Sequence, residues 1–131
     1  MADLKATLTL TGTAADLGST LSLSVTDTGS VVSPTVGVSI KSATTTGAST
    51  VIVPNVDSTK YVYIKHTGLN SAGGSSGADQ VKVETADGTE IIRLSKEEFA
   101  FFPYYGGAAC KLQLEATANT VQVEYAYFTR A

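Results

Sequence analysis

Strict alternation of apolar and polar residues is the feature that most constrains the fold of this chain. The pattern recurs in five segments, at residues 4–10, 21–26, 36–41, 110–115 and 121–127. Because successive side chains of a strand point to opposite faces, each segment is expected to bury one face and expose the other. Two apolar runs, at residues 51–53 and 61–64, are typical of strands buried on both faces or at an interface. No segment has a convincing period of 3.6, so the pattern predicts strands rather than helices.

Composition agrees with this interpretation. Threonine, serine, valine and glycine together supply 57 of the 131 residues, and the β-branched Thr and Val fit a pleated sheet better than a helix. At about 150 residues per domain, the chain is expected to form a single domain over residues 1–131. We therefore predict an all-β fold, an antiparallel β-sandwich resembling a jelly roll, with nine or ten strands and the first few residues as a candidate extended arm.

The clearest predicted hairpin runs from Val81 to Leu94. Asp87-Gly88 is a favoured pair for a two-residue type I′ turn, which requires positive φ at both positions. The register that follows pairs Glu84 with Ile91, Val83 with Ile92, Lys82 with Arg93, and Val81 with Leu94. The apolar pairs then share the core face. Lys82 and Arg93 meet on the other face, where Glu84 is expected to relieve their repulsion.

A capping-box pattern follows the hairpin, because Ser95 stands three residues before Glu98. We expect at most one short helical turn over Ser95–Glu98, since an apolar run that ends in Pro103 resumes directly afterwards. Two longer loops are expected to be flexible, at Ser42–Thr50 and at the glycine- and serine-rich segment Gly68–Gly77.

Residue counts and motifs exclude several classes of site. The single cysteine, Cys110, excludes an internal disulfide, and the single histidine, His66, excludes a conventional zinc site. No serine lies in a Gly-x-Ser-x-Gly motif, so we expect no catalytic residue, metal or cofactor, and structural roles for His66 and Cys110. The net charge of −3 argues against nucleic-acid binding. Neither a signal peptide nor an apolar run of roughly 18 residues is visible, so no membrane association is expected.

Aromatic residues gather in two clusters in the last third of the chain, at residues 99–105 and 125–128. Such clusters usually fill a core or an oligomer interface, where tyrosine is enriched. A carbohydrate-stacking patch is the alternative. The candidate oligomer-interface residues are those of the first cluster: Phe99, Phe101, Phe102, Tyr104 and Tyr105.

Charged residues are distributed unevenly. Residues 6–56 carry three charges in 51 positions, whereas residues 57–131 carry sixteen. One explanation is that serine and threonine hydroxyls solvate the first half. The other is that much of this half lies against another protein chain, since interface cores are depleted of charge. The candidate contact residues are then outward polar positions of the first two alternating segments: Thr7, Thr9, Ser22, Ser24 and Thr26.

The stretch from Thr59 to Arg130 resembles small β-sandwich structural proteins of tailed-phage virions. The shared pattern is a Tyr-Val-Tyr-Ile-Lys strand, a glycine-rich loop, a Val-x-Val hairpin, an Ile-x-x-Leu turn, a Glu-Phe-Ala-Phe-Phe-Pro segment and a Val-Glu-Tyr-Ala strand. These motifs lie at Tyr61–Lys65, Gly68–Gly77, Val81–Val83, Ile91–Leu94, Glu98–Pro103 and Val123–Ala126. Where such proteins often place Pro-Gly before the Glu, this chain has Lys96-Glu97.

The resemblance implies a structural function without enzymatic activity. Similar proteins commonly bind the outer surface of an assembled capsid as cement or decoration proteins, often as trimers. The partners implied are further copies of the chain and the major capsid protein, and the location implied is the capsid surface of a virion made in the host cytoplasm. The alternative is a tail-fibre, adaptor or other host-facing protein that binds a receptor or glycan, and a small β-sandwich enzyme is a third hypothesis.

Overall fold

The structure is a computed structural model that describes residues 2–12, 21–33, 37–46, 50–54, 58–105, 107 and 111–131. These residues contain ten strands and no α-helix, which confirms the all-β prediction. The strands are β1 (Ala2–Gly12), β2 (Leu21–Ser33), β3 (Ser39–Ala43), β4 (Thr50–Val53), β5 (Lys60–His66), β6 (Val81–Thr85), β7 (Glu90–Leu94), β8 (Phe99–Tyr104), β9 (Leu112–Ala116) and β10 (Val121–Arg130).

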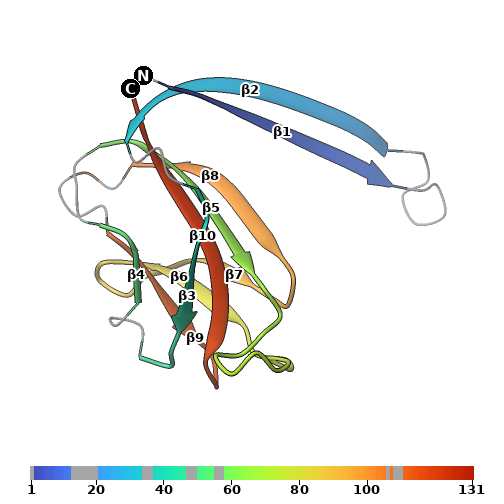
Figure 1. The fold of residues 1–131 in the computed structure, drawn as a ribbon, viewed down its shortest axis with the longest axis vertical. Helices are drawn as coiled ribbons and strands as arrows, with labels where there is room; N and C mark the ends of the chain where they lie inside the picture. The colour runs from blue at the N-terminus through green and yellow to red at the C-terminus, as the bar shows by residue number, and fades with distance from the viewer. Residues whose placement is uncertain are drawn as a thin grey trace.

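The strands form two antiparallel sheets (Figure 1). One sheet has the order β1-β2-β10-β5-β8, with β3 also paired to β10, and the other has the order β4-β9-β6-β7. When β3 to β10 are renumbered from one to eight, their order is 1-8-3-6 in one sheet and 2-7-4-5 in the other. This is the strand order of a jelly roll. The predicted sandwich is therefore confirmed for the part from β3 to β10, which we call the body.

The hydrophobic core lies between the two sheets of the body. Its fully buried side chains come from strands of both sheets and include Val62, Ile64, Val81, Leu112 and Leu114. Complete burial of a valine, isoleucine or leucine side chain contributes roughly 1.5–3 kcal/mol. The apolar residues that stabilise this fold therefore belong to the second half of the sequence for the most part.

The β6–β7 hairpin confirms the predicted register at three pairs and departs from it at the turn. Val81 pairs with Leu94, Lys82 with Arg93 and Val83 with Ile92, but Glu84 pairs with Glu90, so Ile91 is an extra residue in β7. The Gly88 amide donates to the Thr85 carbonyl at 3.1 Å, and the Thr85 amide donates to the Thr89 carbonyl at 3.0 Å. Gly88 has φ +84°, whereas Asp87 does not adopt positive φ.

The type I′ turn predicted for Asp87-Gly88 is therefore wrong. The hairpin has a three-residue loop with glycine in the left-handed conformation, followed by a bulge. Asp87 has a different role from the predicted one, because its carboxylate accepts hydrogen bonds from the Thr89 amide at 3.2 Å and from the Thr85 hydroxyl. These bonds, chiefly the one from Thr85, lower the pKa of Asp87.

The two facing cations of the hairpin have partners other than the predicted Glu84. Lys82 Nζ lies 2.6 Å from Glu115 Oε1 on β9, and Arg93 makes two hydrogen bonds to Glu90, at 2.6 and 2.8 Å. Glu84 is buried instead, where it accepts a 3.4 Å hydrogen bond from the Gln113 side chain. Each cation is thus neutralised separately.

The segment Ser95–Glu98 forms a β-turn and not the helical turn that the capping pattern suggests. The Glu98 amide donates to the Ser95 carbonyl at 3.0 Å, and the Ser95 amide donates back to the Glu98 carboxylate at 2.7 Å. Glu97, the third residue of the turn, has φ +67° and is the one non-glycine residue with positive φ among the described residues. Type II turns place glycine at this position.

The Gly68–Gly77 segment is a compact, hydrogen-bonded hairpin rather than the flexible loop that its composition predicts. Leu69 and Ser75 form a β-bridge. Asn70 Oδ1 accepts hydrogen bonds from two amides within the loop, and the Gln122 amide donates to the Leu69 carbonyl at 2.8 Å. The other predicted loop, Ser42–Thr50, lies partly outside the described residues.

The first two alternating segments do not bury a face in the core, contrary to expectation. β1 and β2 pair along eleven positions, from Ala2–Val31 to Gly12–Leu21, and form a ribbon that projects beyond the body (Figure 1). We call this ribbon the arm. A third alternating segment also departs from the prediction, because Val38 and Ile40 are exposed. Val36 lies outside the described residues.

Candidate functional site

The arm is attached to the body only at its root. β2 pairs with β10 at two positions, Ser33 with Thr129 and Val31 with Arg130, and Val31 is buried there. Among the described residues, no strand pairs with the outer edge of β1. A ribbon of eleven residues spans roughly 35 Å. The part of the arm beyond its root therefore extends from the body, with its side chains exposed on both faces (Figure 1).

One face of the arm carries hydroxyl side chains and contains all five candidate contact residues. Thr7 pairs with Thr26 and Thr9 pairs with Ser24, and Ser22 lies opposite Thr11 on the same face. The hydroxyl oxygens of Thr7 and Thr26 are 2.9 Å apart. All five residues are exposed. The structure thus brings them together on one surface, which we call the hydroxyl face.

The opposite face of the arm carries aliphatic side chains, and we call it the leucine face. Cross-strand pairs on it join Leu8 to Val25 and Leu10 to Leu23. These four side chains and Leu21 are between 42 and 51% exposed. An isolated apolar residue at a protein surface is ordinary, but a contiguous apolar face of this kind marks an interaction site.

The root half of the leucine face overhangs the outer face of the β10-β5-β8 sheet and encloses a groove of about 690 Å³. The arm contributes Leu4, Ala6, Leu8 and Val25 to the groove, together with Lys5, Thr7 and Asp27. The body contributes Val38, Tyr63, Phe99, Ala100, Phe101, Ala126 and Phe128. The groove is therefore apolar on both walls, and Lys5 and Asp27 are the charged residues among its lining.

The predicted aromatic interface divides into two sets in the structure. Phe99 and Phe101 point outward from β8 and line the groove, and Phe101 stacks on Tyr61 with ring centroids 6.2 Å apart. Phe102 and Tyr104 point the other way and pack against the core. Tyr105 is exposed after the end of β8. The surface available for an interface is thus Phe99, Phe101 and Tyr105.

Two polar side chains of the groove, those of Tyr63 and Asp27, have hydrogen-bond partners. The Tyr63 hydroxyl donates to Glu124 Oε1 at 2.8 Å. Burial, followed by this hydrogen bond and the negative charge of Glu124, raises the pKa of Tyr63 to about 12. The Tyr63 phenol therefore stays protonated at physiological pH. The Asp27 carboxylate accepts a 2.9 Å hydrogen bond from the Thr28 amide.

A glycine sets how closely the root of the arm approaches the body. A Cβ atom at Gly29 would lie 2.7 Å from the Tyr61 hydroxyl oxygen and 3.0 Å from the ring, closer than atoms can approach without movement. Because Tyr61 is itself stacked on Phe101, a side chain at Gly29 would disturb the groove wall. Gly29 therefore serves close packing, which is a common reason for glycine within a strand.

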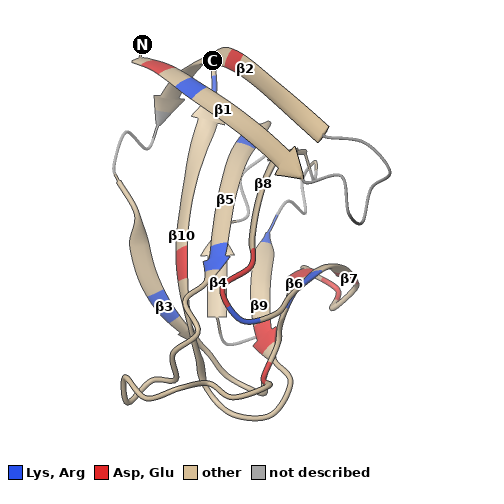
Figure 2. Ribbon diagram, turned by 90° about the vertical axis from the view of Figure 1, so that its right-hand side faces the viewer, with Lys and Arg blue, Asp and Glu red and all other residues tan. Residues whose placement is uncertain are grey.

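Charge is absent from most of the arm. Figure 2 shows the charged residues of the arm near its root, whereas the far parts of β1 and β2 are uncharged. Residues 6–12 and 21–26 contain no Asp, Glu, Lys or Arg. The charge-poor first half noted in the sequence therefore includes a structural element that projects into solvent (Figure 1).

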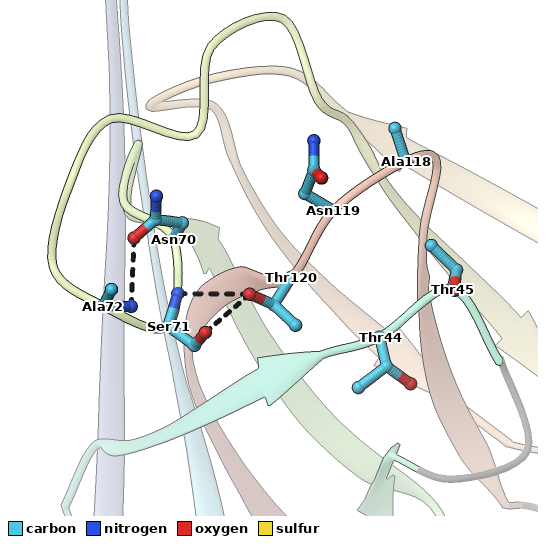
Figure 3. Close-up of a pocket in the computed structure, with 8 residues that line it drawn as sticks. All are labelled: Thr44, Thr45, Asn70, Ser71, Ala72, Ala118, Asn119 and Thr120. Atoms are coloured by element: carbon cyan, nitrogen blue, oxygen red, sulfur yellow. Dashed lines mark hydrogen bonds between the residues drawn. The ribbon is translucent and has the colours of Figure 1, made fainter.

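A second, polar pocket of about 470 Å³ lies among three loops of the body (Figure 3). It is lined by Thr44, Thr45, Asn70, Ser71, Ala72, Ala118, Asn119 and Thr120. The hydroxyl oxygens of Ser71 and Thr120 are 2.6 Å apart, and the Asn119 side chain donates to the Asp79 carboxylate at 2.9 Å. Many of its polar groups thus bind one another, and no lining residue is aromatic, so the pocket offers no ring on which a sugar could stack.

His66 is placed as the sequence predicts, at the end of a strand and in a structural position. Its ring is completely buried, Nδ1 accepts a hydrogen bond from the Gly68 amide at 3.0 Å, and Nε2 lies 2.9 Å from the Asp79 carbonyl oxygen. Because Nδ1 is an acceptor, the ring proton is assigned to Nε2. Cys110 lies outside the described residues.

Sequence reasoning missed the leucine face and the body residues that face it. It assigned Leu4, Leu8 and Leu10 to the core because they alternate, and alternation does not distinguish a core from a surface that awaits a partner. The lack of charge over the same residues was the available signal, and it was applied only to the hydroxyl face.

Neither a metal site nor a membrane span is found in the described part of the chain. No group of three or more His, Cys, Asp or Glu residues is arranged to hold a metal ion there, and no helix there is long and apolar enough to cross a membrane. Comparisons with protein-family models, with curated proteins and with solved structures found no match to this chain.

Proposed function

We propose that this chain is a non-enzymatic structural protein that binds the outer surface of a tailed-phage capsid as a cement or decoration protein. The observation that carries the proposal is the arm, whose two faces and outer edge are left exposed by the chain itself. A long exposed ribbon is a liability for a protein that works alone, because it invites association. For a protein that works by attachment, the same ribbon is the binding element.

The hydroxyl face is the surface proposed to contact the major capsid protein. It carries Thr7, Thr9, Ser22, Ser24 and Thr26, and no charged residue lies in the far part of either strand. Burying such a face requires little desolvation of charge. We therefore expect binding to the shell to depend weakly on salt, unlike a contact steered by charge.

Two further considerations support a virion protein. The jelly-roll order of the body is common among viral capsid domains, although lectins and cupins share it, and a fold alone does not define a function. The resemblance of Thr59–Arg130 to structural proteins of tailed-phage virions is the second. Under this proposal the chain is made in the host cytoplasm and resides on the capsid surface.

The alternative is a tail-fibre, adaptor or other host-facing protein that binds a receptor or glycan. The groove aromatics Phe99 and Phe101 are the residues that such a ligand would use, since the polar pocket has no ring. Electron microscopy of particles labelled through this chain separates the two functions. Label on the head supports decoration, and label confined to the tail supports the alternative.

The contact itself is tested with two substitutions on the hydroxyl face, Thr9→Lys and Ser24→Glu. Each should leave the fold intact and lower the affinity for shells by at least about tenfold, because an unpaired charge must be desolvated in the contact. Co-sedimentation with shells that lack the chain measures the binding. The genomic neighbourhood identifies which shell to use, since the gene is expected beside a major capsid gene.

The matched controls place the same charges on exposed alanines of the body, as Ala86→Lys and Ala78→Glu. Both controls should occupy shells as well as the parent does. Equal occupancy by all four folded variants would show that the hydroxyl face is ordinary solvent surface and would remove this contact from the proposal.

A further inference from the structure

The leucine face continues past the end of the groove. The groove is lined by the root half of the face, up to Leu8 and Val25. Beyond these residues lie Leu10, Leu21 and Leu23, which are exposed and do not line the groove. We call these three residues the tip. The chain therefore has an apolar projection and an apolar groove at different places.

The tip and the groove are complementary in chemistry. The tip is aliphatic and belongs to a charge-free stretch, while the groove walls are aliphatic and aromatic. The tip cannot fold back into its own groove, because β1 and β2 remain paired over all eleven positions and carry the tip past Leu8 and Val25. A projection that fits a depression elsewhere on the same molecule makes a head-to-tail contact between copies.

The surface area of the chain indicates how much is left for such a contact. Its accessible surface is 7243 Å². A compact monomer of 13.5 kDa exposes about 6,500 Å². The excess of roughly 700 Å² is close to the roughly 800 Å² that each partner buries in a standard protein–protein interface. The chain therefore exposes extra surface about equal to what one partner contributes to such an interface.

We propose that the occupant of the groove is the tip of the arm from a second copy of this chain. The leucine side chains of each tip enter the groove between the arm root and the Phe99–Phe101 surface of the next copy, and the series closes into a ring. This contact buries the leucine face and leaves the hydroxyl face outward. It does not depend on the proposed shell function, because it concerns the isolated protein.

The first experiment measures the mass of the purified chain by sedimentation at micromolar concentrations. The parent should be a discrete oligomer. The double variant Leu10→Asp/Leu23→Asp changes one cross-strand pair of the tip outside the groove, and it should be monomeric with an unchanged β-sheet circular dichroism spectrum. A parent that is monomeric would overturn the proposal and leave the shell proposal standing.

The matched control is Thr9→Asp/Ser24→Asp, which changes the adjacent cross-strand pair on the opposite face of the same strands. It places the same charges in the same strands and should remain assembled. Dissociation of the control as well would show that charge anywhere on the arm disrupts assembly, and the assignment to the leucine face would then fail.

The second experiment identifies the two contacting surfaces by disulfide formation. It uses a Cys110→Ser variant as the starting chain, after sedimentation has shown that this variant forms the same oligomer as the parent. Mixed Leu10→Cys and Phe101→Cys chains should form a covalent heterodimer, and Thr9→Cys in place of Leu10→Cys should not. A double Leu10→Cys/Phe101→Cys chain should give a ladder that stops at the ring size. Homodimers of Leu10→Cys without the heterodimer would show arms packed face to face and would overturn the groove as the site.

Discussion

The two hairpins β1–β2 and β6–β7 have the same kind of sequence pattern and opposite surroundings. Both alternate apolar and polar residues and both pair in antiparallel register. In β6–β7, Val81, Val83 and Leu94 are completely or almost completely buried against the opposite sheet. In β1–β2, the corresponding leucines are more than two-fifths exposed.

A period of two therefore defines a face of a strand but not what covers that face. Charge is what separates the two hairpins. The solvent face of β6–β7 carries Lys82, Glu90 and Arg93, each in an ion pair. The far half of β1–β2 carries no charge on either face. A hairpin that lacks charge on both faces is therefore a candidate for contact with another chain.

The largest effect is expected from one leucine substitution in the core beside β6–β7, set against the same substitution in the arm. Leu114→Ala, in the core strand that pairs with β6, should lower the free energy of unfolding by about 2–5 kcal/mol. Leu10→Ala, the same change on the arm, should alter it by no more than about 0.5 kcal/mol in dilute monomer. Urea denaturation followed by circular dichroism measures both.

A large loss of stability from Leu10→Ala in monomeric protein would contradict this prediction, because it would mean that the arm is packed against its own chain in solution. Ile64→Ala, in the other sheet of the core, serves as a second large-effect reference. The unchanged denaturant dependence of both core variants would confirm that they unfold from the same folded state.

A smaller effect is expected at the turn of the β6–β7 hairpin. Gly88 has φ +84° and no atom within 4 Å of an added Cβ, so a substitution there tests the backbone conformation alone. Gly88→Val should lower the free energy of unfolding by about 1–2 kcal/mol, which is the usual penalty for the left-handed conformation. Thermal unfolding measures it.

Two variants control this prediction. Gly88→Asn should recover much of the loss, because asparagine tolerates the left-handed conformation. Gly37→Val should be nearly neutral, since Gly37 also has open space around it and does not have positive φ. If valine at both positions were equally harmless, the assigned conformation of Gly88 would be incorrect.

The smallest effect expected is a gain, at the turn that leads from β7 to β8. Glu97 has φ +67°, so Glu97→Gly should raise the free energy of unfolding by up to about 1 kcal/mol. Glycine relieves the strain of the left-handed conformation, and the greater freedom of glycine in the unfolded chain offsets part of this gain. Glu98→Gln, which keeps the side chain that accepts from Ser95, is the control for loss of charge and should give no gain. A decrease for Glu97→Gly would mean that the Glu97 side chain stabilises the turn.

The same turn illustrates how far a sequence pattern can be interpreted. Ser-x-x-Glu predicts a hydrogen bond from the Ser95 amide to Glu98, and this bond is present, although the backbone is a β-turn and not a helix. Lys96-Glu97 occupies the second and third positions of this turn, where a type II turn favours Pro-Gly. The local contact could therefore be predicted, and the backbone conformation could not be predicted from the capping pattern alone.

The fold class and most of the core follow from the sequence, because Val81, Val83, Leu112 and Val121 lie in alternating strands whose opposite faces carry charged residues. The placement of the arm does not follow. Leu4, Leu8 and Leu10 satisfy the same pattern, and only the strand order of the sheet decides that no second layer covers them. The aromatic cluster divided for a related reason, since Phe101 and Phe102 are neighbours that a strand must place on opposite faces.

β10 has a consequence for how the molecule is completed during synthesis. It pairs with β2, β3 and β5, all of which precede it in the sequence. The sheet that holds the arm therefore cannot close until β10 has left the ribosome, so a chain that lacks β10 carries a leucine ribbon without these strand pairs. Synthesis of β10 is therefore needed to anchor the arm, because the strand pairs between arm and body involve Thr129 and Arg130.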